Sequence, residues 1–140
     1  MQNCVICFLF FLGSFSAFST NVRVRIFVDV QLTSVILTPL NGKYVVYADG
    51  KMINAEADIF QFILNKDSID VKTLQRPVGT FSKIQLISDQ AENNFKVKPV
   101  VPQLPVKSYG DNLEISVNAQ SLRLINNTDI EHYIAGVVEA

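Results

Sequence analysis

Cysteine and histidine are scarce in this sequence of 140 residues. The two cysteines, Cys4 and Cys7, lie in an apolar run near the N-terminus, and His132 is the only histidine. The C-x-x-C spacing is typical of redox and metal sites, but the apolar run supplies no further ligands, so we interpret both cysteines as part of that run. A lone histidine is far more often solvated than catalytic, and it has no second histidine with which to hold a metal. We therefore predict no metal site, no cofactor and no disulfide bond in the rest of the chain.

Charge of one sign is not concentrated in any part of the sequence. Lys and Arg number 12, Asp and Glu number 13, and the two signs are interspersed, which gives a net charge of −1. Because no basic stripe is present, the sequence gives no support for a nucleic-acid partner. Hydrophobic residues make up 49% and charged residues 18%, so we expect one ordinary domain with a buried core.

Long apolar runs are also lacking. The run over residues 4–12 is too short to span a membrane comfortably. It is followed by small residues that end in Ala17-Phe18-Ser19, an order typical of a secretory signal peptide. We predict that residues 1–19 are a signal peptide, cleaved after Ser19, and that the protein is exported to the periplasm, cell envelope or extracellular space. A short membrane anchor or a buried strand is the alternative.

Strand patterns dominate residues 20–106. Residues 22–30 alternate, which places Val22, Val24, Ile26, Val28 and Val30 on one face of a strand. Asn41-Gly42 predicts a turn, and Asp49-Gly50 predicts a two-residue hairpin. Further strand candidates are residues 34–40, 43–48, 52–55, 59–64, 68–74, 81–88 and 94–100, of which 59–64 could also form a helical turn. Residues 99–110 contain three prolines and are predicted to be an extended connection, not a regular element.

Residues 109–140 combine a hairpin with a helix. Leu113, Ile115 and Val117 share one strand face, residues 118–121 turn the chain, and Leu122 and Leu124 return on a second strand. The period then becomes helical, because apolar residues recur on one face at Ile130, Tyr133, Ile134, Val137 and Val138. We therefore predict a mainly β fold with a C-terminal α-helix (α+β), built from antiparallel strands and hairpins.

A capping box is predicted at the start of this helix. Thr128 and Glu131 have its spacing, in which the threonine hydroxyl accepts from the Glu131 amide and the Glu131 side chain reaches back. We therefore interpret Glu131 as a cap and not as a catalytic carboxylate. Asp49 and Asp111 are interpreted as turn residues.

The order of residues from Tyr109 onward resembles the SpoIID/LytB family of cell-wall proteins, named for stage II sporulation protein D. The family pattern runs from Tyr-Gly through a hairpin and Ile-Asn to (Leu/Ile)-Glu-x-Tyr-(Leu/Ile)-x-Gly-Val-Val-x-x-Glu. This sequence matches at Tyr109-Gly110, Leu113, Ile115, residues 124–126 and residues 130–138. Residues 20–106 fit more loosely. We therefore divide the chain after the signal peptide into a strand-rich part, residues 20–106, and a hairpin with its helix, residues 109–140.

The resemblance implies peptidoglycan remodelling. Family enzymes are similar to lytic transglycosylases, which cleave glycan strands and leave an anhydro sugar end. A single Glu with a pKa raised by burial acts as acid and later as base. In the family pattern this Glu would follow Ala140, so no catalytic residue is assigned within the sequence, and substrate-binding residues are unknown. Glu139 occupies an x position and is not given the role. We accordingly expect the N-terminal part of a longer protein, with the catalytic helical region truncated.

The resemblance leaves enzyme and binding module open. The first reading is a lytic transglycosylase-like activity of the full-length protein on peptidoglycan glycan strands. The alternative is a non-catalytic peptidoglycan-binding module that recruits or stimulates a cell-wall amidase. A secreted β-domain of unrelated function is the third reading. A Glu directly after Ala140 would discriminate the first two.

Overall fold

The computed structural model describes residues 19–53, 58–90 and 93–138. Both cysteines and the predicted signal peptide, except Ser19, lie outside these residues. Across the three ranges the structure has no helix that is both long and apolar enough to cross a membrane. Its elements are β1 Asn21–Ile26, β2 Ser34–Asn41, β3 Tyr44–Ala48, β4 Lys51–Ile53, β5 Phe60–Asn65, β6 Ser68–Thr73, β7 Pro77–Phe81, β8 Lys83–Ser88, β9 Asn94–Val101, β10 Lys107–Gly110, β11 Asn112–Asn118, β12 Ser121–Asp129 and α1 Ile130–Val138.

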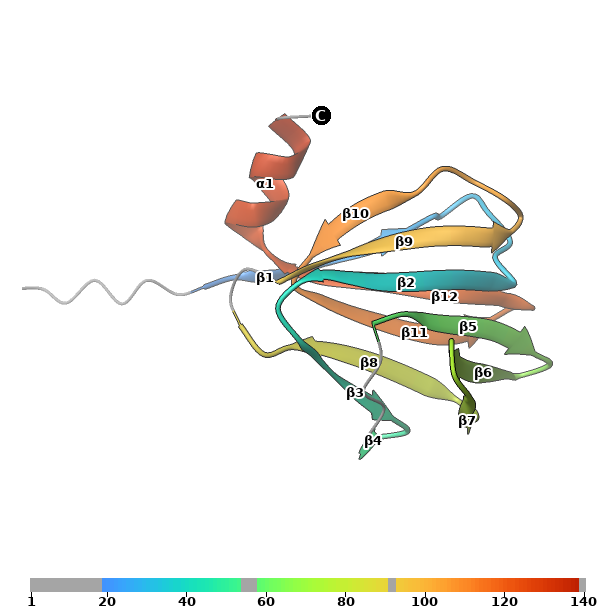
Figure 1. The fold of residues 1–140 in the computed structure, drawn as a ribbon. Helices are drawn as coiled ribbons and strands as arrows, with labels where there is room; N and C mark the ends of the chain where they lie inside the picture. Colours follow the sequence, from blue (N-terminus) through green and yellow to red (C-terminus); the bar gives the residue numbers. More distant parts are fainter. Residues whose placement is uncertain (1–18, 54–57, 91–92, 139–140) are drawn as a thin grey trace, which may run out of the picture.

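The strands form two antiparallel sheets of six strands each. Sheet A has the order β1-β12-β11-β8-β3-β4, and sheet B has the order β10-β9-β2-β5-β6-β7. Figure 1 shows the strands of both sheets running along the body of the domain and α1 projecting from one end. The predicted mainly β fold with a C-terminal helix is confirmed. Residues 59–64, which could also have formed a helical turn, contribute to strand β5.

One hydrophobic core lies between the two sheets. Alternate residues of each strand face it, as period-two patterning requires. Its largest fully buried side chains include Phe60, Phe62 and Phe95 from sheet B and Leu113 and Ile115 from sheet A. Because β11 and β12 occupy the middle of sheet A, the hairpin of the resembled pattern shares this core with the strands before residue 106.

The hairpin predictions are confirmed at both positions. Asp49 and Gly50 connect β3 to β4 with φ angles of 49° and 79°, as a type I′ turn requires. Ala119 and Gln120 connect β11 to β12 with φ angles of 48° and 61°, although neither is a glycine. Asp111 also has a positive φ, 61°, in agreement with its interpretation as a turn residue.

One strand prediction and the prediction of an irregular connection over residues 99–110 were wrong in part. The first strand stops at Ile26 because Phe27 adopts a φ of 54°, and Val28 is consequently 53% exposed instead of facing the core. Residues 99–110 are more regular than predicted, since β9 runs to Val101 and β10 begins at Lys107. Pro99 lies within β9 beside a shift in the β2–β9 register. At such an irregularity no ladder hydrogen bond from this residue is required, so a proline, which has no backbone N–H, is tolerated.

Candidate functional site

The carboxylate of Asp111 joins three parts of the chain at the base of α1. One of its oxygens, Oδ2, accepts from the Thr128 hydroxyl at 2.6 Å and from the Asp129 amide at 3.0 Å. The His132 Nδ1 lies 3.2 Å from the same oxygen. Asp111 sits between β10 and β11, so this one group ties the start of the hairpin to the end of β12 and the first turn of the helix.

Asn126 makes a second connection beside it. Its side chain is buried on β12, and Nδ2 donates to the carbonyls of Gly110 at 2.7 Å and Asn112 at 2.9 Å. Tyr109, the residue before Gly110, packs its ring against Phe95. The structure therefore brings the Tyr-Gly pair and the asparagine of the resembled pattern together, although 16 residues separate Gly110 from Asn126.

The predicted capping box is wrong. Thr128 belongs to β12, and its hydroxyl donates to Asp111 instead of accepting from Glu131. Asp129 caps the helix, because its Oδ1 accepts from the Glu131 amide at 2.8 Å. The Ile130 amide donates to the Thr20 carbonyl at 2.9 Å. The helix start is thus satisfied by the residue before it and by the segment that leads into β1.

The pKa of the Asp129 carboxyl is held below its ordinary value. In the uncleaved chain the Ser19 hydroxyl bond is the largest cause, followed by the Glu131 amide bond. The side-chain amide of Asn93 is likewise the largest cause of the lowered pKa of Asp89. Both groups are therefore carboxylates at neutral pH and cannot serve there as proton donors.

The Asp129 cap provides a pH-dependent prediction. Because its folded-state pKa is depressed, the cap contributes fully above the ordinary value of 3.8 and is lost as pH falls through the folded-state pKa. In an NMR titration, we expect the Glu131 amide to report a midpoint below 3.8. Asp129→Asn is the matched control, because asparagine keeps the cap and does not titrate. A midpoint above 3.8, or the same transition in the control, would contradict this role.

A shallow polar cleft of about 520 Å³ adjoins this cluster. Its lining includes Asp89, Asp111, Asp129, Glu131 and His132. Glu131 and His132 are exposed on the first turn of α1, so neither is enclosed as a general acid would need to be. The cleft can accept hydrogen bonds from hydroxyl or amide groups of a ligand. Across the described ranges, no three His, Cys, Asp or Glu residues are arranged to hold a metal ion.

The apolar face of α1 is open. Every residue of the helix is exposed, including Tyr133 at 42%, Ile134 at 54% and Val137 at 58%. The predicted stripe therefore exists as a helix face, but no described residue buries it. The catalytic Glu of the resembled pattern would lie beyond Ala140, and Glu139 lies outside the described residues.

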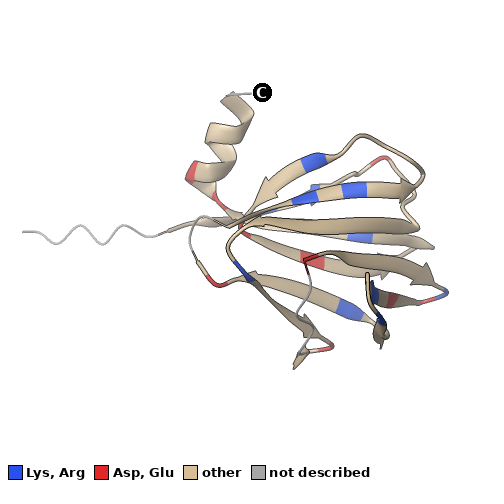
Figure 2. Cartoon of the chain, viewed as in Figure 1, with Lys and Arg blue, Asp and Glu red and all other residues tan. Residues whose placement is uncertain are grey.

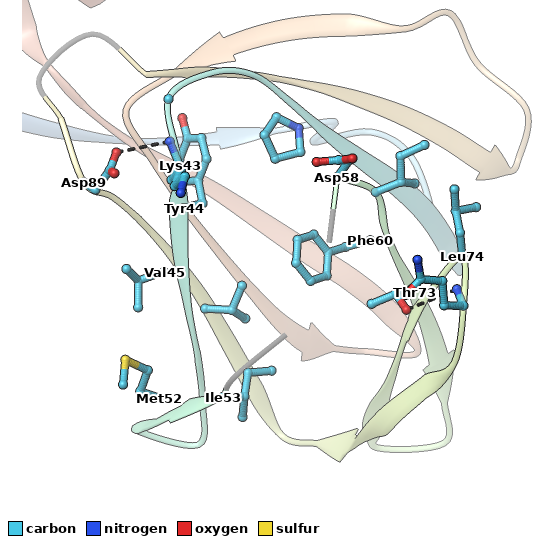
Figure 3. Close-up of a pocket in the computed structure, with 15 residues that line it drawn as sticks. Lys43, Tyr44, Val45, Met52, Ile53, Asp58, Phe60, Thr73, Leu74 and Asp89 are labelled. Carbon is cyan, nitrogen blue, oxygen red and sulfur yellow. Dashed lines mark hydrogen bonds between the residues drawn. The ribbon is translucent and has the colours of Figure 1, made fainter. Parts of the chain in front are cut away.

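A larger cavity of about 880 Å³ lies between the two sheets and is lined by residues of β3 and β4 in sheet A and of β5 and β6 in sheet B. Figure 3 shows Tyr44 and Ile53 on its sheet A side and Phe60 and Thr73 on its sheet B side. Burial raises the pKa of the Tyr44 phenol, whose hydroxyl has no hydrogen-bond partner among the described residues. The cavity contains no residue of the resembled pattern, so the cluster around Asp111 and Asn126 is the candidate site.

The comparisons with known proteins give no relative for this chain. No protein-family model, curated protein or solved structure matches it. Function must therefore be argued from the residues of the chain and their arrangement.

Proposed function

We propose that this domain acts on peptidoglycan and that it is similar to the SpoIID/LytB family. The observation that supports the proposal is the convergence of the pattern residues at the base of α1. Asn126 bonds to Gly110 and Asn112, which gives a physical reason for an asparagine on the returning strand of a Tyr-Gly hairpin. The helix that follows in the pattern is then anchored by Asp111 and Asp129.

The proposed reaction of the full-length protein is lytic cleavage of glycan strands. The acid must carry a proton at neutral pH. Asp89 and Asp129 in the cleft have lowered pKa values and do not meet that requirement. We therefore assign the acid to the family position after Ala140 and expect the 140-residue chain to bind peptidoglycan without cleaving it.

A non-catalytic role is the second candidate. The exposed apolar face of α1 favours it, because an open face beside the cleft could contact a partner such as a cell-wall amidase. In this version the domain binds glycan strands and recruits or stimulates that enzyme.

Co-sedimentation with purified peptidoglycan, followed by mass spectrometry of the soluble products, tests the proposal. We expect the 140-residue chain to sediment with the polymer and to release no anhydro-muropeptides. A second experiment adds a cell-wall amidase. If the domain stimulates that enzyme, as the second candidate function requires, the amidase will release more product in its presence. A chain that stays in the supernatant would contradict the proposal. If this chain released anhydro ends, the general acid would have to be Glu131 or Glu139.

A further inference from the structure

The outer face of sheet A carries a row of side chains that crosses all six strands. Paired residues of antiparallel strands project from the same face. From β1 to β4, the register aligns Arg25, Ile125, Glu114, Gln85, Tyr47 and Met52, which we call the central row. Five strand spacings separate its ends, or about 24 Å. Ile125 is 7% exposed and is covered by its neighbours, whereas the other members of the row are partly or fully accessible along this length.

Basic side chains surround the middle of this row. Arg23 and Lys83 each lie 3.2 Å from the carboxylate of Glu114, which they approach from β1 and β8. Arg25 and Arg123 are exposed on the same face, and neither forms an ion pair within the ranges that the structure describes. Four cations and one carboxylate therefore lie on this part of the face, and only Arg23 and Lys83 pair with that carboxylate, although the whole chain has a net charge of −1.

The acidic residues of the domain lie mostly elsewhere. Figure 2 shows Asp and Glu chiefly at turns and at the base of the helix, whereas Lys and Arg lie along several strands. Asp129 ends the same strand as Arg123 and adds a second carboxylate, which lies at the base of α1 and caps the helix. The outer face of sheet A is consequently a positive surface on a chain without excess positive charge.

We propose that the central row, together with Arg123 beside it on β12, binds a glycan strand that bears carboxylate groups. This inference rests on the proposed function and locates its binding surface. The guanidinium groups of Arg25 and Arg123 suit carboxylates, which they can bind with two parallel hydrogen bonds. Gln85 and Tyr47 continue the row with amide and phenol groups that can bond to sugar hydroxyls.

Glu114 favours a glycan over other polyanions. It lies in the middle of the row and can accept hydrogen bonds from sugar hydroxyls. A nucleic acid would instead place a continuous row of phosphates beside this carboxylate. The repulsion between these like charges would weaken its binding. A glycan strand that carries carboxylates at every second sugar, on a free lactyl group or on a stem peptide, can place them beside the arginines and its hydroxyls beside Glu114.

The test compares two charge reversals by co-sedimentation with purified peptidoglycan. Arg25→Glu/Arg123→Glu is expected to weaken binding at least about tenfold, because two charge-assisted contacts become repulsive. Lys72→Glu/Lys98→Glu is the matched control on the outer face of sheet B and should bind as wild type does. The milder Arg25→Gln/Arg123→Gln variant removes the charges without reversing them, so it is less prone to misfold. It should also bind more weakly than wild type.

The outcomes separate this site from the proposed function. If wild type does not bind peptidoglycan, the proposed function fails. If wild type binds and the arginine variants bind equally well, the function stands and the central row is wrong as its site. Equal affinity of wild type for DNA or for anionic lipid vesicles would also overturn the glycan assignment.

Discussion

Replacing Asn126 by alanine is expected to lower the free energy of unfolding by about 2–4 kcal/mol, because a buried side chain that donates two hydrogen bonds is removed. The carbonyls of Gly110 and Asn112 lose this donor, and water has little access to the site. The loss should appear as a lower midpoint in denaturant unfolding followed by circular dichroism.

Asn118→Ala is the matched control for this substitution. Asn118 lies at the end of β11 in the same hairpin, but it is exposed, so its replacement should change stability by less than about 0.5 kcal/mol. Equal midpoints for the two variants would mean that Asn126 does not hold the hairpin. The hydrogen bonds from Asn126 to Gly110 and Asn112 would then not explain why the pattern has an asparagine at this position.

The second large effect is expected at Gly42. This residue leads the chain from β2 in sheet B to β3 in sheet A, and its φ is 71°. An added Cβ would overlap the carboxamide of Asn93. Asn93 is itself buried and donates to the Lys43 carbonyl and the Asp89 carboxylate, each at 2.7 Å. We expect Gly42→Ala to cost about 2–4 kcal/mol in chemical denaturation, from backbone strain together with the clash.

Gly50→Ala isolates the strain from the clash. Gly50 has a similar φ of 79°, but no atom lies within 4 Å of an added Cβ. Its replacement should therefore show only the backbone term, about 1 kcal/mol. If the two alanine variants lost equal stability, the contact between Gly42 and Asn93 would have no energetic role.

Local signals in the sequence were sufficient for much of the fold. The dipeptide Asp49-Gly50 determines its hairpin because both residues accept a positive φ. The helical spacing from Ile130 to Val138 determines α1, because few other structures repeat at this period. Even the turn at Ala119-Gln120, which has no glycine, could be placed from the strand patterns on either side.

The errors arose where a distant residue decides the local structure. Thr128 has the spacing of a capping box, but its hydroxyl donates a hydrogen bond to Asp111, 17 residues away, and Asp129 caps the helix instead. Phe27 continues the alternating pattern, yet the strand ends there because its ring packs against the core beside Tyr109. Such contacts depend on the complete fold and leave no periodic signal.

The candidate site was predictable in part. The sequence singled out Gly110 and Asn126 from the resembled pattern, but not the hydrogen bond that joins them. Asp111 was interpreted as a turn residue, which its positive φ confirms, while its three contacts at the helix start were missed. The cations of the outer face come from β1, β8 and β12, and only the strand order places them together.

Binding of this domain to the glycan of peptidoglycan can be measured directly. The most direct test is an NMR titration of the ¹⁵N-labelled chain with soluble glycan strands prepared from peptidoglycan. We expect saturable chemical-shift changes, with amides of β1, β8, β11 and β12 among those affected. Unchanged spectra at a large excess of glycan, with the chain folded throughout, would show that the domain does not bind the glycan.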